Sequence, residues 1–340
     1  MGLLPFLLRR LLLVIPTLIG ITLATFTISH TVPADPVIAS LGQRAQDNPA
    51  IVAQYRHRWG FDQPLPTQYA LYVRNLLQGD LGVSITTRRA VTDDLKQFFP
   101  ATLELSTAAV LISLLIGLPL GVLSAVRRNR LTDHLARLIS LIGISIPVFW
   151  LGLLGLIVLW YHLNILPGPS GQLDRGITPP PPRANIMLLD CLLAGDGTAF
   201  VNALWHLILP ATVLGAYTLG IITRMTRGSM LEVLSQDYMR TARAKGLPQR
   251  RAVLTHGLRN AIIPTLTLAG LAYGSLLSGA VLTETVFSWP GIGSYATQTA
   301  GQLDFPAVMG VALITALVYL LLNLVVDVLY TVLNPQVRLG

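Results

Sequence analysis

Long apolar runs, separated by shorter polar segments, dominate the chain. The six longest runs cover about residues 11–31, 105–126, 138–162, 206–223, 261–283 and 307–329. The first five contain no Asp, Glu, Lys or Arg, and the sixth contains only Asp327, near its end. Because about 20 apolar residues of α-helix cross a hydrocarbon core about 30 Å thick, the pattern predicts an all-α polytopic membrane protein with six transmembrane helices.

The composition agrees with this pattern. Hydrophobic residues make up 52% of the 340 residues and charged residues only 12%, whereas soluble domains carry about 25% charged residues. The single cysteine, Cys191, excludes an internal disulfide and a thiolate metal cluster. A net charge of +8 suits nucleic acid in a soluble protein, but here its distribution matters more than its sum. We therefore expect membrane lipid around most of the chain and no nucleic acid partner.

Basic residues gather in alternate segments, and this predicts the orientation. If the N-terminus is cytoplasmic, the cytoplasmic segments hold 15 of the 24 lysines and arginines against three acids, Asp133, Glu232 and Asp237. The 15 are Arg9, Arg10, Arg127, Arg128, Arg130, Arg137, Arg224, Arg227, Arg240, Arg243, Lys245, Arg250, Arg251, Arg259 and Arg338. Because short loops rich in Lys and Arg stay in the cytoplasm, both termini and residues 224–260 are expected there.

The polar segments divide the chain into three parts. Residues 1–31 hold the N-terminus and the first span, and residues 32–100 are expected to form a small helical outer domain between helices 1 and 2. Residues 101–340 hold the other five spans and the cytoplasmic loop 224–260. The first run is about 20 residues long and has no evident small-residue cleavage site, so we expect a retained helix rather than a signal peptide.

Three short helices are predicted in the outer domain. The first begins at Asn48-Pro49 and runs through IVAQYRHRW, the second begins at Pro66 and is closed by Gly79, and the third covers TDDLKQFFP. A second outer segment, residues 163–205, contains TPPPPR, which favours extended polyproline geometry. The outer domain is expected to cap the spans, to receive an outside partner, or to do both.

One short helix with both ends marked is predicted in the cytoplasmic loop, within SQDYMRTARAKGLP. Ser235 suits the N-cap, and Asp237 places an acid near the positive end of the helix dipole. Arg243 and Lys245 fall in the last turn, where cations are favourable, and Gly246 suits the left-handed position that follows. The markers predict a helix of about ten residues.

A helix this short is marginal alone in water, so it needs a surface to lie on. Tyr238, Met239 and Ala242 share one face at helical spacing, and the small residues Thr241 and Ala244 allow close approach of a partner. Two interpretations stay open from this pattern. The helix caps its own bundle from the cytoplasmic side, or it offers a docking face to a cytoplasmic partner.

The loop resembles a known motif. The general motif of permease subunits of binding-protein-dependent ABC importers runs Glu-Ala-Ala, three residues, then Gly, with a later Ile-x-Leu-Pro. Here RTA, RAK and Gly246 match its first part, with Arg240 in place of Glu. The terminal part, within LRNAIIP, lies farther from Gly246 than in the general motif. Both departures are similar to the dipeptide/oligopeptide/nickel branch of that family. Similar segments follow along nearly the whole chain: RRLLLVIPTLIGIT, GDLGVSI, PATLELS, SIPVFWLG, HLILPA, RMTRGSMLEVL, LTETVFSWPGIG and NLVVDVLYTVLNP.

The resemblance, closest to the first permease subunit of dipeptide systems, implies a type I ABC importer permease in a bacterial inner membrane. It implies a periplasmic or lipid-anchored peptide-binding protein and two cytoplasmic ATPases that bind ATP and Mg. The coupling residues that it implies are Asp237, Tyr238, Arg240, Thr241, Ala242, Arg243, Lys245 and Gly246. Dipeptides or short peptides are the expected cargo, with D,D-dipeptides, glutathione and nickel complexes left open. Because six spans are few for a peptide path, we expect a heterodimer with a second related permease.

The chain itself carries no expected catalytic or cofactor-binding residue. A Walker A loop needs Gly-Lys followed by Ser or Thr, and the only lysines, Lys96 and Lys245, stand in other contexts. The ATPase is therefore expected on separate polypeptides. The six histidines form no His-x-x-x-His pair or Cys/His cluster, so no metal site is predicted.

Three acids lie near span ends, namely Glu104, Glu284 and Asp327. We interpret them mainly as interfacial or capping acids within reach of water. Glu284 precedes FSWPGIG, so Glu284, Trp289, Pro290 and Gly291 form a candidate outer gate, with the Trp289 ring suited to the membrane interface.

These acids also leave a different class open. A proton-coupled secondary transporter would use membrane acids as proton relays, and a scaffold protein would carry no solute. Neither alternative explains the coupling loop, which favours the importer.

Overall fold

The structure, a computed structural model, describes residues 3–31, 50, 53 and 62–333. Within these residues the chain is almost entirely helical and forms no β-strand, which confirms the all-α class. The longest helices are α1 (Leu3–Thr31), α6 (Val91–Val126), α10 (Gly197–Ser235), α13 (Leu258–Gly279) and α16 (Phe305–Leu333). The shorter helices are α5 (Leu65–Leu77), α7 (Leu131–Ser145), α8 (Val148–Gly155), α9 (Met187–Ala194), α11 (Asp237–Ala244), α12 (Gln249–Arg251), α14 (Val281–Phe287) and α15 (Ile292–Gly301), and two segments are π-helical, η1 (Leu156–His162) and η2 (Ala252–Gly257).

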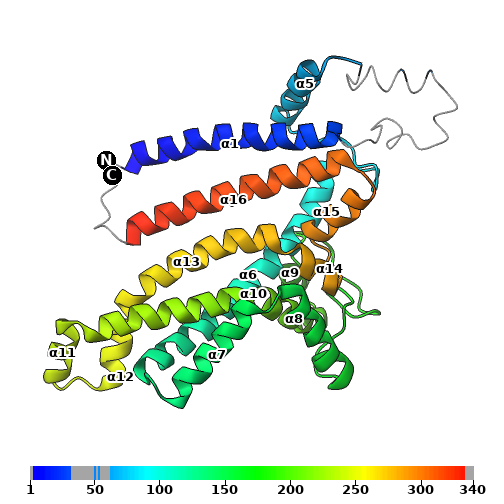
Figure 1. The fold of residues 1–340 in the computed structure, drawn as a ribbon. Helices are drawn as coiled ribbons and strands as arrows, with labels where there is room; N and C mark the ends of the chain where they lie inside the picture. The colour runs from blue at the N-terminus through cyan, green and yellow to red at the C-terminus, as the bar shows by residue number, and fades with distance from the viewer. Residues whose placement is uncertain (1–2, 32–49, 51–52, 54–61, 334–340) are drawn as a thin grey trace.

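The long helices lie side by side, and their ends gather on two opposite sides of the molecule (Figure 1). The start of α1, the end of α16 and the short helix α11 lie on one side, whereas α5, α14 and α15 lie on the other. Five of the described helices are long and apolar enough to cross a membrane. The bent pair formed by α7 with α8–η1 provides a sixth span if it is counted as one.

The third predicted span, residues 138–162, is not straight. It breaks between α7 and α8, whose axes differ by 109°. Pro147 causes the break, because proline lacks an N–H and disfavours the helical conformation in the residue before it; Ile146 is accordingly extended, with φ −86° and ψ 129°. Beyond the break, α8–η1 packs against α10 and α14 through a cluster of Leu156, Leu209, Val213 and Phe287.

Helix α10 is the centre of the bundle. It has 39 residues, a length of about 59 Å at 1.5 Å per residue, and therefore extends beyond a hydrocarbon core about 30 Å thick. Its apolar stretch is 56% buried, against 17% for that of α1 and 11% for that of α16. One helix thus runs from the outer segments to α11 through the middle of the protein.

Helix α7 touches α10 backbone to backbone at two glycines. A Cβ at Gly143 would lie 2.5 Å from the carbonyl oxygen of Ala216, and a Cβ at Gly220 would lie 2.6 Å from that of Ser140. Small residues are the usual means of such close approach between membrane helices. The α7–α10 crossing therefore depends on the absence of side chains at both positions.

The predicted outer helices have different outcomes. The first, beginning at Asn48, falls almost wholly outside the described residues. The second is confirmed as α5, followed by Gly79 at φ +78°. Helix α5 lies against the outer part of α1, where the hydroxyl groups of Tyr69 and Thr22 are 3.0 Å apart.

The third predicted outer helix is not separate, because TDDLKQFFP forms the first turns of α6, which continues through Pro100. Proline removes the helical donor to the carbonyl four residues earlier. Asn185 supplies the missing donor, with its Nδ2 3.3 Å from the Lys96 oxygen. This explains how one helix crosses from the outer part of the chain into the second span.

The second outer segment crosses the outer ends of α6 and α10 as an irregular loop over residues 170–174. Gln172 Nε2 donates to Glu104 Oε2 at 2.9 Å, and Asn202 Nδ2 donates to Asp174 Oδ2 at 2.7 Å. The proline run that follows is not helical, as predicted.

We predict that Gly143→Ala destabilises the protein by about 1–3 kcal/mol, because the added methyl group overpacks the α7–α10 crossing. The matched control is Gly228→Ala, since Gly228 is exposed on α10 and an added Cβ there meets no atom within 4 Å. Alanine at a free helical position is neutral or stabilises by up to about 1 kcal/mol. Thermal unfolding of the purified variants in mild detergent measures the difference, and equal melting temperatures would contradict the close crossing.

Candidate functional site

The cytoplasmic helix α11 joins α10 through a single extended residue. Helix α10 ends at Ser235, Gln236 has φ −69° and ψ 151°, and α11 begins at Asp237. The prediction of Ser235 as the N-cap is wrong: its hydroxyl donates to the Glu232 carbonyl at 2.7 Å. Ser235 is the last residue of α10, so Gln236 takes the cap position of α11 without a side-chain cap bond. A one-residue joint leaves α11 little freedom relative to α10.

The other end of α11 has the predicted stop. Gly246 has φ +80°, its N–H donates to the Arg243 carbonyl at 3.0 Å, and the Leu247 N–H donates to the Ala242 carbonyl at 3.3 Å. This pair of bonds is the Schellman motif, which closes helices at a left-handed glycine. Gly246 is therefore confirmed as the terminating residue of a helix of 8 residues, slightly shorter than predicted.

Arg243 fastens α11 to the end of α10. Its Nε donates to the Met239 carbonyl at 3.2 Å, and its Nη2 donates to the Leu234 carbonyl at 3.0 Å. The last carbonyls of a helix have no partner within the helix, and a cation there also suits the helix dipole. One side chain thus satisfies a carbonyl at the end of α10 and adds a hydrogen bond to a carbonyl within α11.

Two motif segments far apart in the sequence meet beside α11. Asn260, from LRNA at the start of α13, donates from Nδ2 to the Tyr238 hydroxyl at 3.0 Å and to the His256 carbonyl at 3.3 Å. Met239 is 1% exposed, and a Cβ at Gly257 would lie 3.7 Å from the Met239 Cε. The protein's own α13 and η2 therefore hold the inner face of α11.

This packing decides which face of α11 the protein's own residues cover. Met239 and Ala242 face the protein, because a helix of this length must bury an apolar side chain to be stable; Ala242 is half-buried and Tyr238 is 42% exposed. The outward surface is polar or small instead. It consists of Asp237, Arg240, Thr241, Ala244 and Lys245, which are all exposed.

The second predicted site lies at the outer side. It is a buried network of hydrogen bonds and not a surface that water reaches. Glu284 is 0% exposed, which contradicts its interpretation as an interfacial acid. Its Oε1 accepts from Thr102 Oγ1 at 2.5 Å, and its Oε2 accepts from the Ser294 N–H at 2.9 Å. Thr102 Oγ1 in turn accepts the Ile292 N–H at 2.8 Å. Because free N–H groups at a helix N-terminus attract negative charge, Glu284 caps α15 and joins it to α6.

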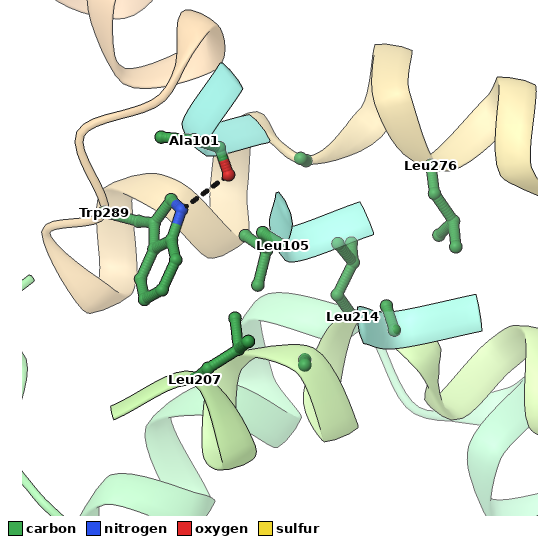
Figure 2. Close-up of a cluster of buried hydrophobic side chains, with 9 residues drawn as sticks. Ala101, Leu105, Leu207, Leu214, Leu276 and Trp289 are labelled. Carbon is green, nitrogen blue, oxygen red and sulfur yellow. Dashed lines mark hydrogen bonds between the residues drawn. The ribbon is translucent and has the colours of Figure 1, made fainter. Parts of the chain in front are cut away.

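Trp289 is also buried, not interfacial. It is 1% exposed and its Nε1 donates to the Ala101 carbonyl at 2.9 Å, as Figure 2 shows beside Leu105 and Leu207. The indole turns inward because Ser288, at φ +53°, reverses the chain after α14. The structure brings all four predicted gate residues into one turn, since Gly291 lies directly against the Glu284 carboxylate and Pro290 is exposed between them.

The other two membrane acids have defined partners. Glu104 accepts the Leu188 N–H at 2.8 Å and so caps the start of α9, as a capping acid should. Asp327 forms an ion pair with Arg10 at 2.9 Å between α16 and α1. Among the described residues no group of three His, Cys, Asp or Glu side chains is arranged to hold a metal ion.

The sequence analysis missed one buried ion pair. Arg227 on α10 reaches Asp133 on α7 with Nε at 2.8 Å and Nη2 at 3.0 Å, and the Asp133 side chain is 0% exposed. In the sequence, both residues count only as charges that indicate the orientation of the loops. The available signal was that Asp133 is the one acid within an arginine-rich cytoplasmic turn.

A groove of 780 Å³ opens between α13, α15 and α16, close to Glu284. Small and apolar residues dominate its lining, including Ser278, Gly279, Ala296, Ala312 and Thr315. Such a surface offers close approach and few polar partners. It therefore suits either a second membrane helix or a passing solute.

Comparison with known proteins gives two family matches and several relatives of the same length. Residues 117–339 match "Binding-protein-dependent transport system inner membrane component", and residues 3–106 match "Binding-prot-dependent transport system membrane comp, N-term". A probable D,D-dipeptide transport system permease protein of Escherichia coli K12 is 54% identical, covering 94% of both chains. A di/tripeptide transport system permease protein of Pseudomonas aeruginosa is 48% identical (98% of this chain, 99% of the relative), and a glutathione transport system permease protein of Salmonella paratyphi A is 37% identical (98% of both).

We predict that Arg243→Gln loosens α11, because the Leu234 and Met239 carbonyls then lose a charged donor. The matched control is Arg240→Gln, since the Arg240 side chain is 74% exposed and its ion pair with Asp237 is local. Hydrogen–deuterium exchange of the purified protein is the measurement: backbone amides of α11 are expected to exchange about tenfold faster in the first variant. Equal exchange in both variants would show that Arg243 does not hold the helix.

Proposed function

Because the chain belongs to the family of inner membrane components of binding-protein-dependent transport systems, we propose that it forms half of the translocation pathway of an ATP-driven ABC importer. The proposed cargo is dipeptides or short peptides, which is the cargo class named for its relatives of 54% and 48% identity. The observation that carries the proposal is α11. This short helix has a defined C-terminal end, is fixed to the central helix α10, and exposes its own polar face.

Helix α11 is suited to transmit movement from a cytoplasmic motor. Rigid-body motion passes through stiff elements, whereas a flexible loop would absorb it. The one-residue joint, the Arg243 bonds and the Tyr238–Asn260 bond stiffen the segment. We assign the docking role to the outward residues Asp237, Arg240, Thr241, Ala244 and Lys245, and a positioning role to Tyr238, Ala242, Arg243 and Gly246.

The motor itself belongs to other polypeptides. The chain is a permease subunit, and its two lysines do not form a Walker A loop. We propose two cytoplasmic ATPase subunits, with ATP and Mg bound there and no cofactor held by this chain.

The importer needs two further partners. We propose a second related permease, so that the peptide path lies between two unlike subunits, and the apolar groove between α13 and α16 supports a close helical contact of this kind. The family description implies a binding protein, and we propose that it is periplasmic or lipid-anchored and delivers peptides.

The protein is a multi-pass component of the inner membrane. We propose that both termini are cytoplasmic. The excess of basic residues supports this orientation, and so does the position of the start of α1 and the end of α16 on the side of α11 (Figure 1).

The turn formed by Glu284, Trp289, Pro290 and Gly291 is our candidate for the outer gate. Its bonds to Thr102 and Ala101 tie it to α6. We propose that it opens together with α6 as one unit rather than as a flexible flap.

A specific observation favours a second cargo within the same function. The relative of 54% identity is named for D,D-dipeptides, so D,D-dipeptides are the first alternative, ahead of glutathione and nickel complexes. A proton-coupled carrier receives less support, because Glu104, Glu284 and Asp327 each engage a capping or ion-pair partner.

Uptake into proteoliposomes tests the function and the cargo. The purified importer, with both permeases, the ATPases and the binding protein, is expected to accumulate a labelled L,L-dipeptide only with ATP and Mg. An excess of unlabelled D,D-dipeptide then decides between the two cargoes, since only a shared pathway gives competition. Uptake driven by a proton gradient without the ATPases would overturn the importer assignment.

We predict that Arg240→Glu weakens attachment of the ATPases, because it reverses a charge at the centre of the outward face of α11. The retained ATPase is expected to fall about tenfold when the tagged complex is purified in mild detergent. The control is Arg74→Glu, which makes the same charge reversal on α5, at the opposite side of the molecule (Figure 1). Unchanged ATPase retention in both variants would refute the docking face.

A further inference from the structure

The buried ion pair between Arg227 and Asp133 joins three helices at the cytoplasmic end of the bundle. Arg227 comes from α10 and Asp133 from the first turn of α7, and the Ser124 hydroxyl of α6 donates to Asp133 Oδ1 at 2.5 Å. The backbone N–H of Asn129, in the α6–α7 turn, donates to Oδ2 at 2.9 Å. One carboxylate thus holds α6, α7, their connecting turn and α10 together.

The arrangement is directional as well as strong. The guanidinium binds both carboxylate oxygens in parallel, and this bidentate geometry fixes orientation more closely than a point charge does. Each oxygen also accepts a second hydrogen bond, from Ser124 or from Asn129. Asn129 adopts the left-handed conformation, at φ +61°, which turns its N–H toward the carboxylate. Any rotation of α10 relative to α7 therefore breaks several bonds at once.

Stability alone does not require this pair. Apolar residues of similar volume in place of a buried ion pair are often neutral or stabilising, because burying two charges is costly. The α7–α10 crossing is already close at Gly143 and Gly220, through backbone contacts alone. What the charged pair adds is a fixed orientation at the end of the bundle nearest to α11.

Arg227 lies close to the end of α10 that carries α11, so the orientation that the pair fixes also bears on α11. Arg227 stands eight residues before the last residue of α10, Ser235, which is about 12 Å along the helix axis. Beyond Ser235, Arg243 fastens α11 to the same helix. Side-chain hydrogen bonds therefore connect α11 to α10, α10 to α7, and α7 to α6.

We propose that Arg227 and Asp133 are a positioning pair for coupling, which transmits displacement of α11 by the ATPases to α6 and α7. This inference rests on the proposed importer function and adds the residues through which movement enters the bundle. ATP is proposed to bind to separate polypeptides, so the pair is no part of the hydrolysis site. Its loss is therefore expected to separate ATP hydrolysis from transport rather than to abolish either directly.

The test compares Arg227→Lys with the wild type in proteoliposomes of the complete importer. Lysine keeps the positive charge and loses the bidentate geometry. The ATP hydrolysed per dipeptide imported is expected to rise about tenfold, while the hydrolysis rate stays within about twofold and the ATPases stay bound. The matched control is Arg137→Lys, because Arg137 reaches the same carboxylate only at 3.6 Å and is exposed; its ratio is expected to equal that of the wild type.

The outcomes separate the inference from the proposed function. If Arg227→Lys lowers transport and hydrolysis in equal proportion, or changes neither, the positioning role is wrong. If its complex does not assemble, Ser124→Ala decides, since it keeps the ion pair and removes only the tie to α6: a raised ratio supports the role and an unchanged ratio overturns it. A wild-type complex without ATP-driven uptake overturns the proposed function itself.

Discussion

The need to satisfy every backbone polar group within hydrocarbon governs this structure, because lipid offers no partner for a free N–H or C=O. At two irregularities of the described helices, a side chain supplies the missing partner. Pro100 frees the Lys96 carbonyl, and Asn185 binds it. The first N–H groups of α15 meet Thr102 and Glu284. These partners come from distant segments, so at both places the hydrogen bonds also join separate parts of the chain.

Protein donors also satisfy backbone groups at the cytoplasmic end, where water is within reach. The Leu234 carbonyl at the end of α10 takes its donor from Arg243, which belongs to the next helix. The Schellman bonds at Gly246 satisfy the end of α11. A free carbonyl in water at these positions would cost little and would leave the joint loose. The chain instead supplies protein donors for groups that solvent also reaches, which favours a mechanical role for the segment over a merely covering one.

The sequence predicted the spans and the end of α11, but it did not predict which side chains are buried or which way they face. Apolar runs located the spans, and Gly246 marked the end of α11, because both signals act within a few residues. The sequence analysis placed Trp289 at the membrane interface and Glu284 near water, yet both are buried by contacts with Ala101 and Thr102, more than 180 residues away. It left open whether Met239 faces the protein or a partner, since helical spacing shows which residues share a face but not which way that face points. The bend at Pro147 also has a local signal, the proline itself. The sequence analysis did not predict it, because the apolar run around Pro147 is long enough to cross a membrane as one helix.

The distribution of polar ties suggests where the bundle yields when α11 moves. Polar bonds join α6, α7 and α10 near α11, and others join α15 to α6 at the outer side. Helices α13 and α16 meet differently: Gly270 packs against Val326 and Gly274 against Tyr319, through apolar contacts. Dispersion contacts change little when helices slide by small amounts, whereas a bidentate ion pair has one geometry. If α11 transmits movement as proposed, α6, α7 and α10 turn together, and the bundle adjusts at the apolar contacts between α13 and α16, beside the groove.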